Sequence, residues 1–287
     1  FIQNKFLALI SWWNCNNGII HKNYSKSDEK MIFEYFIVIL LGLAFGSFSN
    51  VLINRLPLGM SIITPSQCPH CKINIKFYDN IPLLGYLFLK GQSRCCQKKI
   101  SAQYPLIEIL ITCLAVISFS YYNTSIGSVA IFLLFVSLVI LFTTDYKEYI
   151  IPNSITYPLA TIGLSLSILE LNPLGTFVID SLLGGVISGL LFFTVSKIYL
   201  YLRKREGLGL GDVKMISMIG FWLGIESIIF IIIISSVLGI FIGLMLVASN
   251  KINTKDYLPY GCFISIAALI LIFLKLEFNF NGLLFIN

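Results

Sequence analysis

The chain of 287 residues is 57% hydrophobic and only 12% charged, and its mean hydropathy is +0.86. A soluble domain carries about 25% charged residues, so this composition excludes an ordinary soluble enzyme and indicates a membrane protein with several spans. The net charge of +6 is explained by lysines and arginines in loops. With no basic stripe among exposed aromatic residues, we expect no nucleic-acid binding.

Residues 1–30 precede the first long apolar run and are interpreted as an atypical N-terminal extension. They do not begin with Met, they lack a clear cleavage-site pattern, and they contain Lys22, Lys26 and Lys30. Met31 opens the hydrophobic run and would be a natural start. We therefore assign residues 1–30 no function.

Apolar segments fill most of the remaining chain, and a transmembrane helix needs about 20 mostly apolar residues. The pattern predicts an all-α polytopic membrane protein with about eight transmembrane helices, or seven if the short sixth segment is re-entrant. The predicted spans are 32–53, 104–121, 127–144, 153–170, 177–200, 208–224, 226–249 and 258–275.

A polar insertion, residues 54–103, follows the first span. The predicted division is therefore 31–103, which holds the first span and this insertion, and 104–287, a membrane-embedded bundle. We expect the insertion to be a small cytoplasmic domain that resembles a zinc ribbon, because four of the chain's seven cysteines lie in it.

The CxxC sequence formed by Cys68 and Cys71 is a knuckle of the kind that binds zinc, and Cys95 and Cys96 supply a second pair. Adjacent cysteines point in different directions, so both can bind one ion only with an unusual backbone. His70 is an alternative ligand, and a group of reduced thiols without metal is the alternative interpretation. We favour a structural zinc site formed by Cys68, Cys71, Cys95 and Cys96.

Lysines and arginines concentrate in loops on one side of the predicted bundle. The insertion holds seven of them against one acid, Asp79, whereas the connections at 122–126 and 171–175 hold none. With eight spans, the insertion and the basic loops after the fifth and seventh spans share one side, which the positive-inside rule identifies as cytoplasmic. The lysines before the first span are the exception, because they would lie outside.

Two isolated carboxylates lie on this cytoplasmic side. Asp145 ends the third predicted span, and Asp212 belongs to the sequence Gly-Leu-Gly-Asp-Val-Lys at 209–214. Alone, Asp145 could be an ordinary interface charge and Asp212 a helix cap in a glycine-rich turn. An ionisable group at a membrane boundary is a functional candidate, however, and an aspartyl protease needs two. One carboxylate must be charged to activate water, and the other must be protonated to polarise the scissile carbonyl.

Three further acids lie within predicted spans. Glu34 and Asp180 fall near outer ends, where solvation is cheap, and we expect no function for them. Glu108 lies one turn inside the second span and is expected to pair with Arg55 or a loop lysine. We interpret Glu108 as structural or substrate-facing and not as catalytic.

Six ordered motifs between residues 42 and 265 resemble those of the type IV prepilin peptidase family. Members of this family are bifunctional leader peptidases and N-methyltransferases of bacterial inner membranes. One departure is the second cysteine pair, usually CxxC in the family, in which Ser93 takes the first place and Cys96 the second. The motifs are Gly46 to Pro57, the first CxxC with Asp79 to Gly85, Ile100-Ser101 with Tyr104 to Glu108, Asp145 with Ile151-Pro152-Asn153, Gly209 to Lys214, and Pro259-Tyr260-Gly261.

The resemblance implies cleavage of the basic leader from type IV prepilins and type II secretion pseudopilins, with Asp145 and Asp212 as the catalytic pair. It also implies methylation of the new N-terminal amine, with S-adenosylmethionine as donor. The expected location is the bacterial inner membrane, with the active site facing the cytoplasm and the bundle in contact with membrane lipid.

Three alternatives remain open at this point. The chain could be a peptidase that has lost methylation, a transporter that uses its acids as proton or cation sites, or an assembly factor without catalysis. The lack of repeated halves and of broken helices in matching places argues against a transporter.

Overall fold

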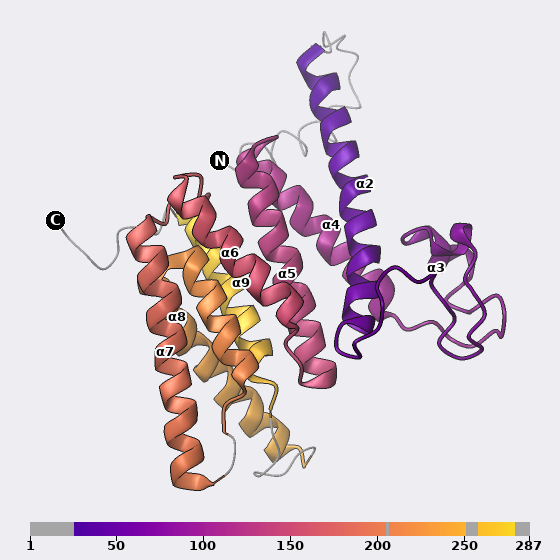
Figure 1. The fold of residues 1–287 in the computed structure, drawn as a ribbon. Coiled ribbons are helices and arrows are strands. Elements are labelled where there is room, and N and C mark those ends of the chain that lie inside the picture. The colour runs from indigo at the N-terminus through magenta and orange to yellow at the C-terminus, as the bar shows by residue number, and fades with distance from the viewer. Residues whose placement is uncertain (1–25, 205–206, 251–257, 279–287) are drawn as a thin grey trace.

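The computed structural model describes residues 26–204, 207–250 and 258–278, and the regular structure within them is helical apart from two isolated β-bridges (Figure 1). Most of the proposed N-terminal extension lies outside the described residues, and the division at residues 103 and 104 stays a prediction. The helices are α2 (Lys26–Arg55), α3 (Leu84–Phe88), α4 (Gln103–Tyr122), α5 (Ile126–Glu148), α6 (Asn153–Ile168), α7 (Val178–Arg203), α8 (Leu210–Ala248) and α9 (Tyr260–Phe278), with a 3₁₀ turn at Phe77–Asn80.

Six of the described helices are long and apolar enough to cross a membrane, namely α2, α4, α5, α7, α8 and α9. Helix α6 has 16 residues, which is fewer than the roughly 20 that a span needs. Helix α8 is one continuous assignment of 39 residues that covers two predicted spans, 208–224 and 226–249. The all-helical membrane architecture is therefore confirmed, and the number of eight spans stays a prediction.

Helix α8 turns sharply at Gly224, where φ is 79°, a left-handed value that suits glycine. A straight helix would separate Asp212 from Ser235 by about 35 Å. Both residues instead lie near the start of α9. The Ser235 hydroxyl is 3.0 Å from that of Tyr260, and the backbone of Gly261 lies against Asp212. The second part of α8 thus runs back toward the end at which the first part begins (Figure 1).

Carbonyl groups freed by this turn are bonded by neighbouring elements. The Trp222 carbonyl accepts hydrogen bonds from Asn172 (3.1 Å) and Thr176 (2.8 Å), and the Leu223 carbonyl accepts one from the Lys275 amine (3.1 Å). An unpaired carbonyl is costly inside a bilayer, where no water replaces the lost partner. The loop before α7 and the end of α9 therefore stabilise the reversal.

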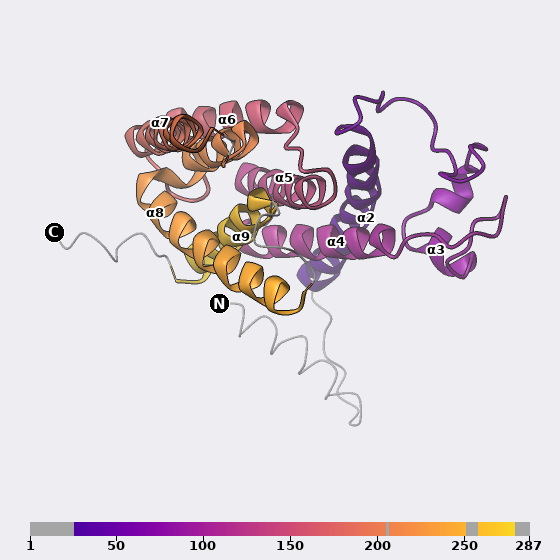
Figure 2. The same ribbon diagram turned by 90° about the horizontal axis from the view of Figure 1, so that it is seen from below.

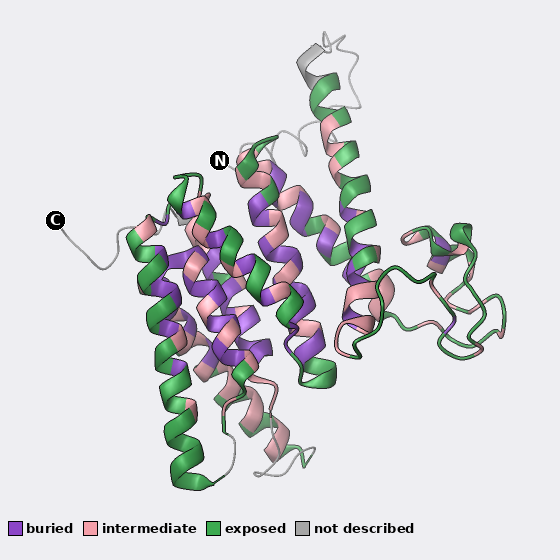
Figure 3. Cartoon of the chain, in the orientation of Figure 1, coloured by how far each residue is buried: buried purple, intermediate pink, exposed green. Residues whose placement is uncertain are grey.

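The core lies along α5, α8 and α9, whereas large parts of α2 and α7 are exposed (Figure 3). Helices α7 and α8 pack closely through Gly184 and Gly220, because a methyl group on either glycine would strike the backbone of the other. The exposed side chains of α2 and α7 are mostly apolar, as expected for surfaces that face lipid.

The insertion projects beside the end of α2 and away from α6 to α9 (Figures 1 and 2). Its two β-bridges pair Gln67 with Asn74 and Gln92 with Lys99. An ion pair of 2.7 Å between Arg94 and Asp79 joins the second bridge region to the 3₁₀ turn. The insertion is therefore organised by short turns and polar contacts rather than by a large core.

Candidate active site and cysteine cluster

Asp145 and Asp212 come together at one end of the bundle. Asp145 lies in the last turn of α5 and Asp212 in the first turn of α8, and the two residues are only 5% and 9% exposed. The charge of Asp145 acts on Asp212, and the backbone of Gly261 lies against both carboxylates. The structure thus brings together the two aspartates that the sequence singled out, while their catalytic role stays a prediction.

The first turn of α9 holds Asp145 in place. The backbone N–H of Cys262 donates a hydrogen bond of 2.9 Å to Asp145 Oδ2, while the Cys262 thiol donates to the carbonyl of Phe142 at 3.2 Å. At Gly261, a Cβ atom would lie 2.9 Å from the same carboxylate oxygen and 2.8 Å from Ile151 Cδ1. Glycine therefore allows α9 to approach the aspartate closely.

The glycine-rich turn before α8 positions Asp212. The N–H of Gly209 lies 3.3 Å from Asp212 Oδ2, so this carboxylate also caps its own helix, which was the alternative interpretation of the motif. Lys214 in the next half-turn donates to Asn153 Oδ1 at 2.9 Å and thereby joins α8 to the start of α6. Capping and a functional role are compatible, because the carboxylate still lies beside Asp145.

Two buried carboxylates in one site can perform acid–base chemistry. Like charges in apolar surroundings repel, so such a pair holds one proton between its members near neutral pH. The ionised member can accept a proton from water, and the protonated member can donate a hydrogen bond to a carbonyl oxygen. The arrangement therefore suits hydrolysis of an amide bond without a covalent intermediate.

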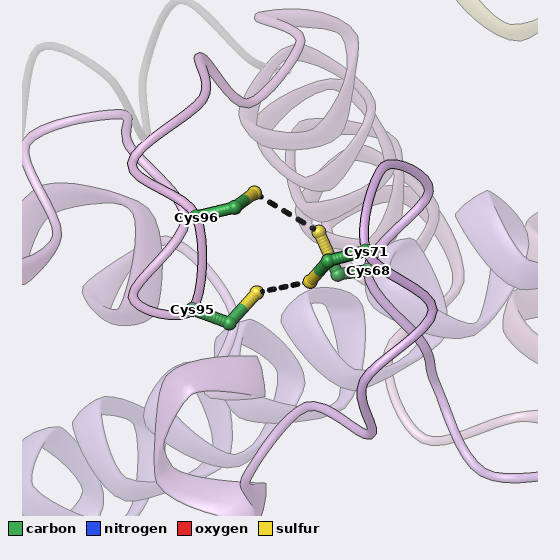
Figure 4. Close-up of side chains that lie close together, drawn as sticks. All are labelled: Cys68, Cys71, Cys95 and Cys96. Carbon is green, nitrogen blue, oxygen red and sulfur yellow. Dashed lines mark hydrogen bonds between the residues drawn. The ribbon is translucent and has the colours of Figure 1, made fainter.

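The four cysteines of the insertion converge (Figure 4). Their sulfur atoms all lie within 4.8 Å of one another, with 3.7 Å between Cys68 and Cys96 and 2.8 Å between Cys71 and Cys95. Zinc–sulfur bonds of about 2.3 Å in a tetrahedron place sulfurs about 3.8 Å apart. The cluster therefore fits a metal ion if Cys71 and Cys95 separate by about 1 Å.

The two turns that carry these cysteines have the same hydrogen-bond pattern, displaced by 25 residues. In the first turn, Cys68 N–H donates to the carbonyl of Ile73, and the Cys68 carbonyl accepts from Lys72. In the second, the corresponding bonds are Ser93 N–H to the Lys98 carbonyl and Gln97 N–H to the Ser93 carbonyl. Ser93 thus corresponds to Cys68, and Cys96 to Cys71.

Cys95 is the thiol that departs from this pattern. It corresponds to His70 of the first turn, yet its sulfur lies 2.9 Å from the Ser93 hydroxyl and within the cluster. The Ser93 hydroxyl also lies 3.5 Å from Cys68 Sγ. A thiol two residues after the expected position therefore joins the group, which the adjacency of Cys95 and Cys96 had made difficult to predict.

The thiols of Cys68 and Cys71 differ in pKa. The Ser93 hydroxyl lowers the pKa of the Cys68 thiol to about 5, and the contact with Cys95 raises the pKa of Cys71 to about 12. Because metals bind thiolates, Cys71 would lose its proton on metal binding. Outside the cluster, the Arg94 guanidinium lowers the pKa of Asp79 through their hydrogen bonds.

Glu108 makes a different contact from the expected one. It is 6% exposed and accepts a hydrogen bond of 2.8 Å from the backbone N–H of Leu83 in the insertion. Arg55 instead donates to Thr64 and neighbouring carbonyls of its own loop, and no lysine pairs with Glu108 among the described residues. The expected ion pair is therefore wrong, because the arginine folds back on the insertion.

Two protein-family models match successive parts of this chain. The bacterial peptidase A24 N-terminal domain matches residues 40–122, and the type IV leader peptidase family matches residues 132–244. The chain is 32% identical to a prepilin leader peptidase/N-methyltransferase of Aeromonas hydrophila, over 80% of this chain and 87% of the relative. Proteins of the same name in Burkholderia pseudomallei (strain K96243) and Klebsiella pneumoniae are 31% and 36% identical, over 79% and 66% of this chain and 81% and 85% of the relatives. No solved structure matches the chain significantly.

Proposed function

The chain belongs to the type IV leader peptidase family, and we propose that Asp145 and Asp212 are the catalytic pair with which it cleaves prepilin leaders. Its relatives are named for two reactions, leader cleavage and N-methylation, and we propose that this chain performs both. The observation that supports the catalytic assignment is the burial of both aspartates against the first turn of α9. A transporter or a non-catalytic assembly factor does not account for this family membership.

In the proposed reaction, the ionised carboxylate of the pair takes a proton from water as the water attacks the scissile carbonyl. The protonated carboxylate donates to the carbonyl oxygen and later supplies a proton to the departing amine. The hydrogen bond from Cys262 N–H keeps Asp145 oriented through these steps. Because the pair shares its proton, we assign the two roles to the pair and not to either residue.

The substrates that fit this site are type IV prepilins and, as a finer proposal, pseudopilins of type II secretion. A basic leader followed by an apolar helix can lie with its helix in the bilayer and its scissile bond at the membrane boundary. The dyad, which is the pair formed by Asp145 and Asp212, is proposed to lie at such a boundary, at the end of α5 and the start of α8. We place this boundary on the cytoplasmic side of a bacterial inner membrane, crossed by eight spans when α6 and both parts of α8 are included.

The cysteine cluster is proposed to hold one structural zinc ion through Cys68, Cys71, Cys95 and Cys96. The insertion has few buried side chains, and a metal stabilises small domains that cannot bury a core. The Ser93 hydroxyl is placed to donate to the thiolate of Cys68, which would support the site.

Methylation requires a donor, and we propose S-adenosylmethionine, with the alternative that this chain has kept only the peptidase. The test is to incubate the purified chain with a prepilin, with and without S-adenosylmethionine, and to weigh the product. We expect a pilin that lacks its leader in both samples and carries one added methyl group only with the donor. Cleavage without methylation would leave a peptidase only, and an intact prepilin would contradict the proposed function.

A further inference from the structure

A second buried polar cluster lies where α2 packs against α4, beside the attachment of the insertion. Asn50 of α2 is 2% exposed and Glu108 of α4 is 6% exposed. The helices approach closely at Gly46, where a Cβ atom would lie 2.7 Å from Glu108 Cα. The half-buried Ser47 lies beside the Glu108 carboxylate.

Asn50 presents an acceptor without a donor. Its amide nitrogen donates to the carbonyls of Gly46 (3.3 Å) and Tyr104 (3.1 Å), which fixes the orientation of the side chain. Its oxygen, Oδ1, is buried and has no hydrogen-bond partner. Buried side-chain oxygens in folded proteins are nearly always paired, so an unpaired one indicates a missing donor.

Glu108 adds a second acceptor on the facing helix, one turn after Tyr104, whose carbonyl Asn50 bonds. Its carboxylate accepts hydrogen bonds from Leu83 N–H and from the Ser47 side chain, and it has no ion-pair partner among the described residues. An amide oxygen and a carboxylate together can receive a group with several N–H bonds. An amine fits this requirement better than any group that only accepts hydrogen bonds.

Polar contacts link this cluster to the dyad end of the bundle. Asn54 lies one turn after Asn50, and its amide is 3.4 Å from the Tyr104 hydroxyl. Lys147, two residues after Asp145, donates to Asn54 Oδ1 at 3.3 Å. An amine released by cleavage at the dyad therefore has a second site close to where it is formed.

Resting on the proposed function, we propose that the Asn50–Glu108 cluster binds the new N-terminal amine of the cleaved pilin for methylation. Asn50 Oδ1 accepts an N–H of the amine and Glu108 takes its proton. The nitrogen lone pair then forms the bond to the methyl group of S-adenosylmethionine. The methyl–sulfur bond breaks with its electron pair on sulfur, which leaves a thioether. This assignment gives Glu108 a direct role in methylation, whereas the sequence led us to expect a structural or substrate-facing residue that is not catalytic.

The decisive variant is Glu108→Gln. Its amide oxygen can still accept the Leu83 hydrogen bond, but it cannot take a proton, so the attachment of the insertion is kept while the base is lost. The matched control is Thr112→Val, one turn further along α4, which removes the hydroxyl bonded to the Glu108 carbonyl and leaves the carboxylate unchanged. Wild type, both variants and Asp212→Asn are compared for cleavage of prepilin and for methyl incorporation into pre-cleaved pilin.

We expect Glu108→Gln to cleave at the wild-type rate and to lose methylation, Asp212→Asn to do the reverse, and Thr112→Val to keep both. A pre-cleaved pilin peptide should bind wild type about tenfold more tightly than its N-acetylated form, and this difference should vanish in Glu108→Gln. Normal methylation by Glu108→Gln, or loss of both reactions, would overturn the proposal and leave the proposed function intact. A wild type that neither cleaves nor methylates would instead overturn the proposed function.

Discussion

Gly261 and Cys262 are neighbours at the start of α9, yet they serve Asp145 in different ways. Gly261 provides space, since an added Cβ would lie 2.9 Å from Asp145 Oδ2, and Cys262 provides a backbone N–H. We expect Gly261→Ala to lower kcat/KM for prepilin cleavage about a hundredfold, because small displacements of a reacting group have effects of this size. Cys262→Ala should cleave at nearly the wild-type rate, since its N–H remains. Equal losses in the two variants would show that the thiol, and not the space beside the carboxylate, matters.

The pH dependence of cleavage should be bell-shaped, because the active pair must hold one proton. Adding a second proton removes the base, and removing the first removes the acid, so activity is lost in both directions. The two limits belong to the pair and not to Asp145 or Asp212 alone. Rates measured on one prepilin across the range in which the enzyme stays folded check this. A single sigmoid together with strong inhibition of the folded enzyme by a thiol reagent would indicate cysteine chemistry.

The charged residues of the candidate site could be predicted from the sequence, whereas the residues that position them could not. Asp145 and Asp212 are visible because isolated acids beside apolar segments are rare. The N–H that holds Asp145 belongs to Cys262, and every residue except proline has such a group, so no sequence signal marks it. Similarly, Glu108 was found, but its partner is a backbone N–H and not the arginine that charge alone suggested.

In the second cysteine turn, the thiol of Cys95 lies two residues after the position that corresponds to Cys68. Cobalt substitution tests whether Cys95 nevertheless binds the proposed metal ion. We expect cobalt-substituted protein to show the absorption of four thiolate ligands in wild type and in Ser93→Ala, and of three in Cys95→Ser. The double variant Ser93→Cys with Cys95→Ser restores the spacing of the first turn and should again show four. Because this turn repeats the hydrogen bonds around Cys68, the new thiol at position 93 would occupy a regular ligand position.

Two results would contradict this assignment. An unchanged spectrum in Cys95→Ser would exclude Cys95 as a ligand, and loss of metal in Ser93→Ala would make the serine hydroxyl essential. A lack of zinc in protein purified without chelator would contradict the proposed metal site.

The Lys275 amine is one of the groups that stabilise the reversal of α8, because it donates a hydrogen bond to the Leu223 carbonyl. We expect Lys275→Met to lower the free energy of unfolding by about 1–3 kcal/mol, because it leaves a buried carbonyl unpaired. Lys197→Met on the exposed face of α7 is the matched control and should change stability little. Thermal unfolding in detergent compares them. Equal effects would mean that the bond at the turn does not stabilise it.

Most helix boundaries were predictable, because hydropathy and helix length determine them. The predicted span 104–121 became α4 (Gln103–Tyr122), and the predicted break between 224 and 226 falls where α8 turns at Gly224. The arrangement of the cysteines was less accessible. It depends on two turns that repeat one backbone pattern, and because Ser93 replaces a thiol, only the resemblance to the family indicated that Ser93 and Cys96 correspond to a CxxC pair.

The residues proposed to act in cleavage and methylation lie at one end of the helix bundle. Asp145, Asp212, the Asn50–Glu108 cluster and the attachment of the insertion all lie at the ends of α2, α4, α5 and α8 that we propose face the cytoplasm. Such an arrangement suits two successive reactions on one substrate. The pilin helix can stay in the bilayer while its leader and then its new amine are processed at the boundary.

We propose that Asp145 and Asp212 form one catalytic unit, and cleavage of a prepilin by Asp145→Asn, Asp212→Asn and the double variant tests this directly. Removing one member of such a unit costs nearly as much as removing both, so each single variant should cleave roughly 10⁴-fold more slowly than wild type, and the double variant about as slowly. Each protein should insert in the membrane as wild type does. Cleavage at the wild-type rate by either single variant would show that the two aspartates are not the catalytic pair.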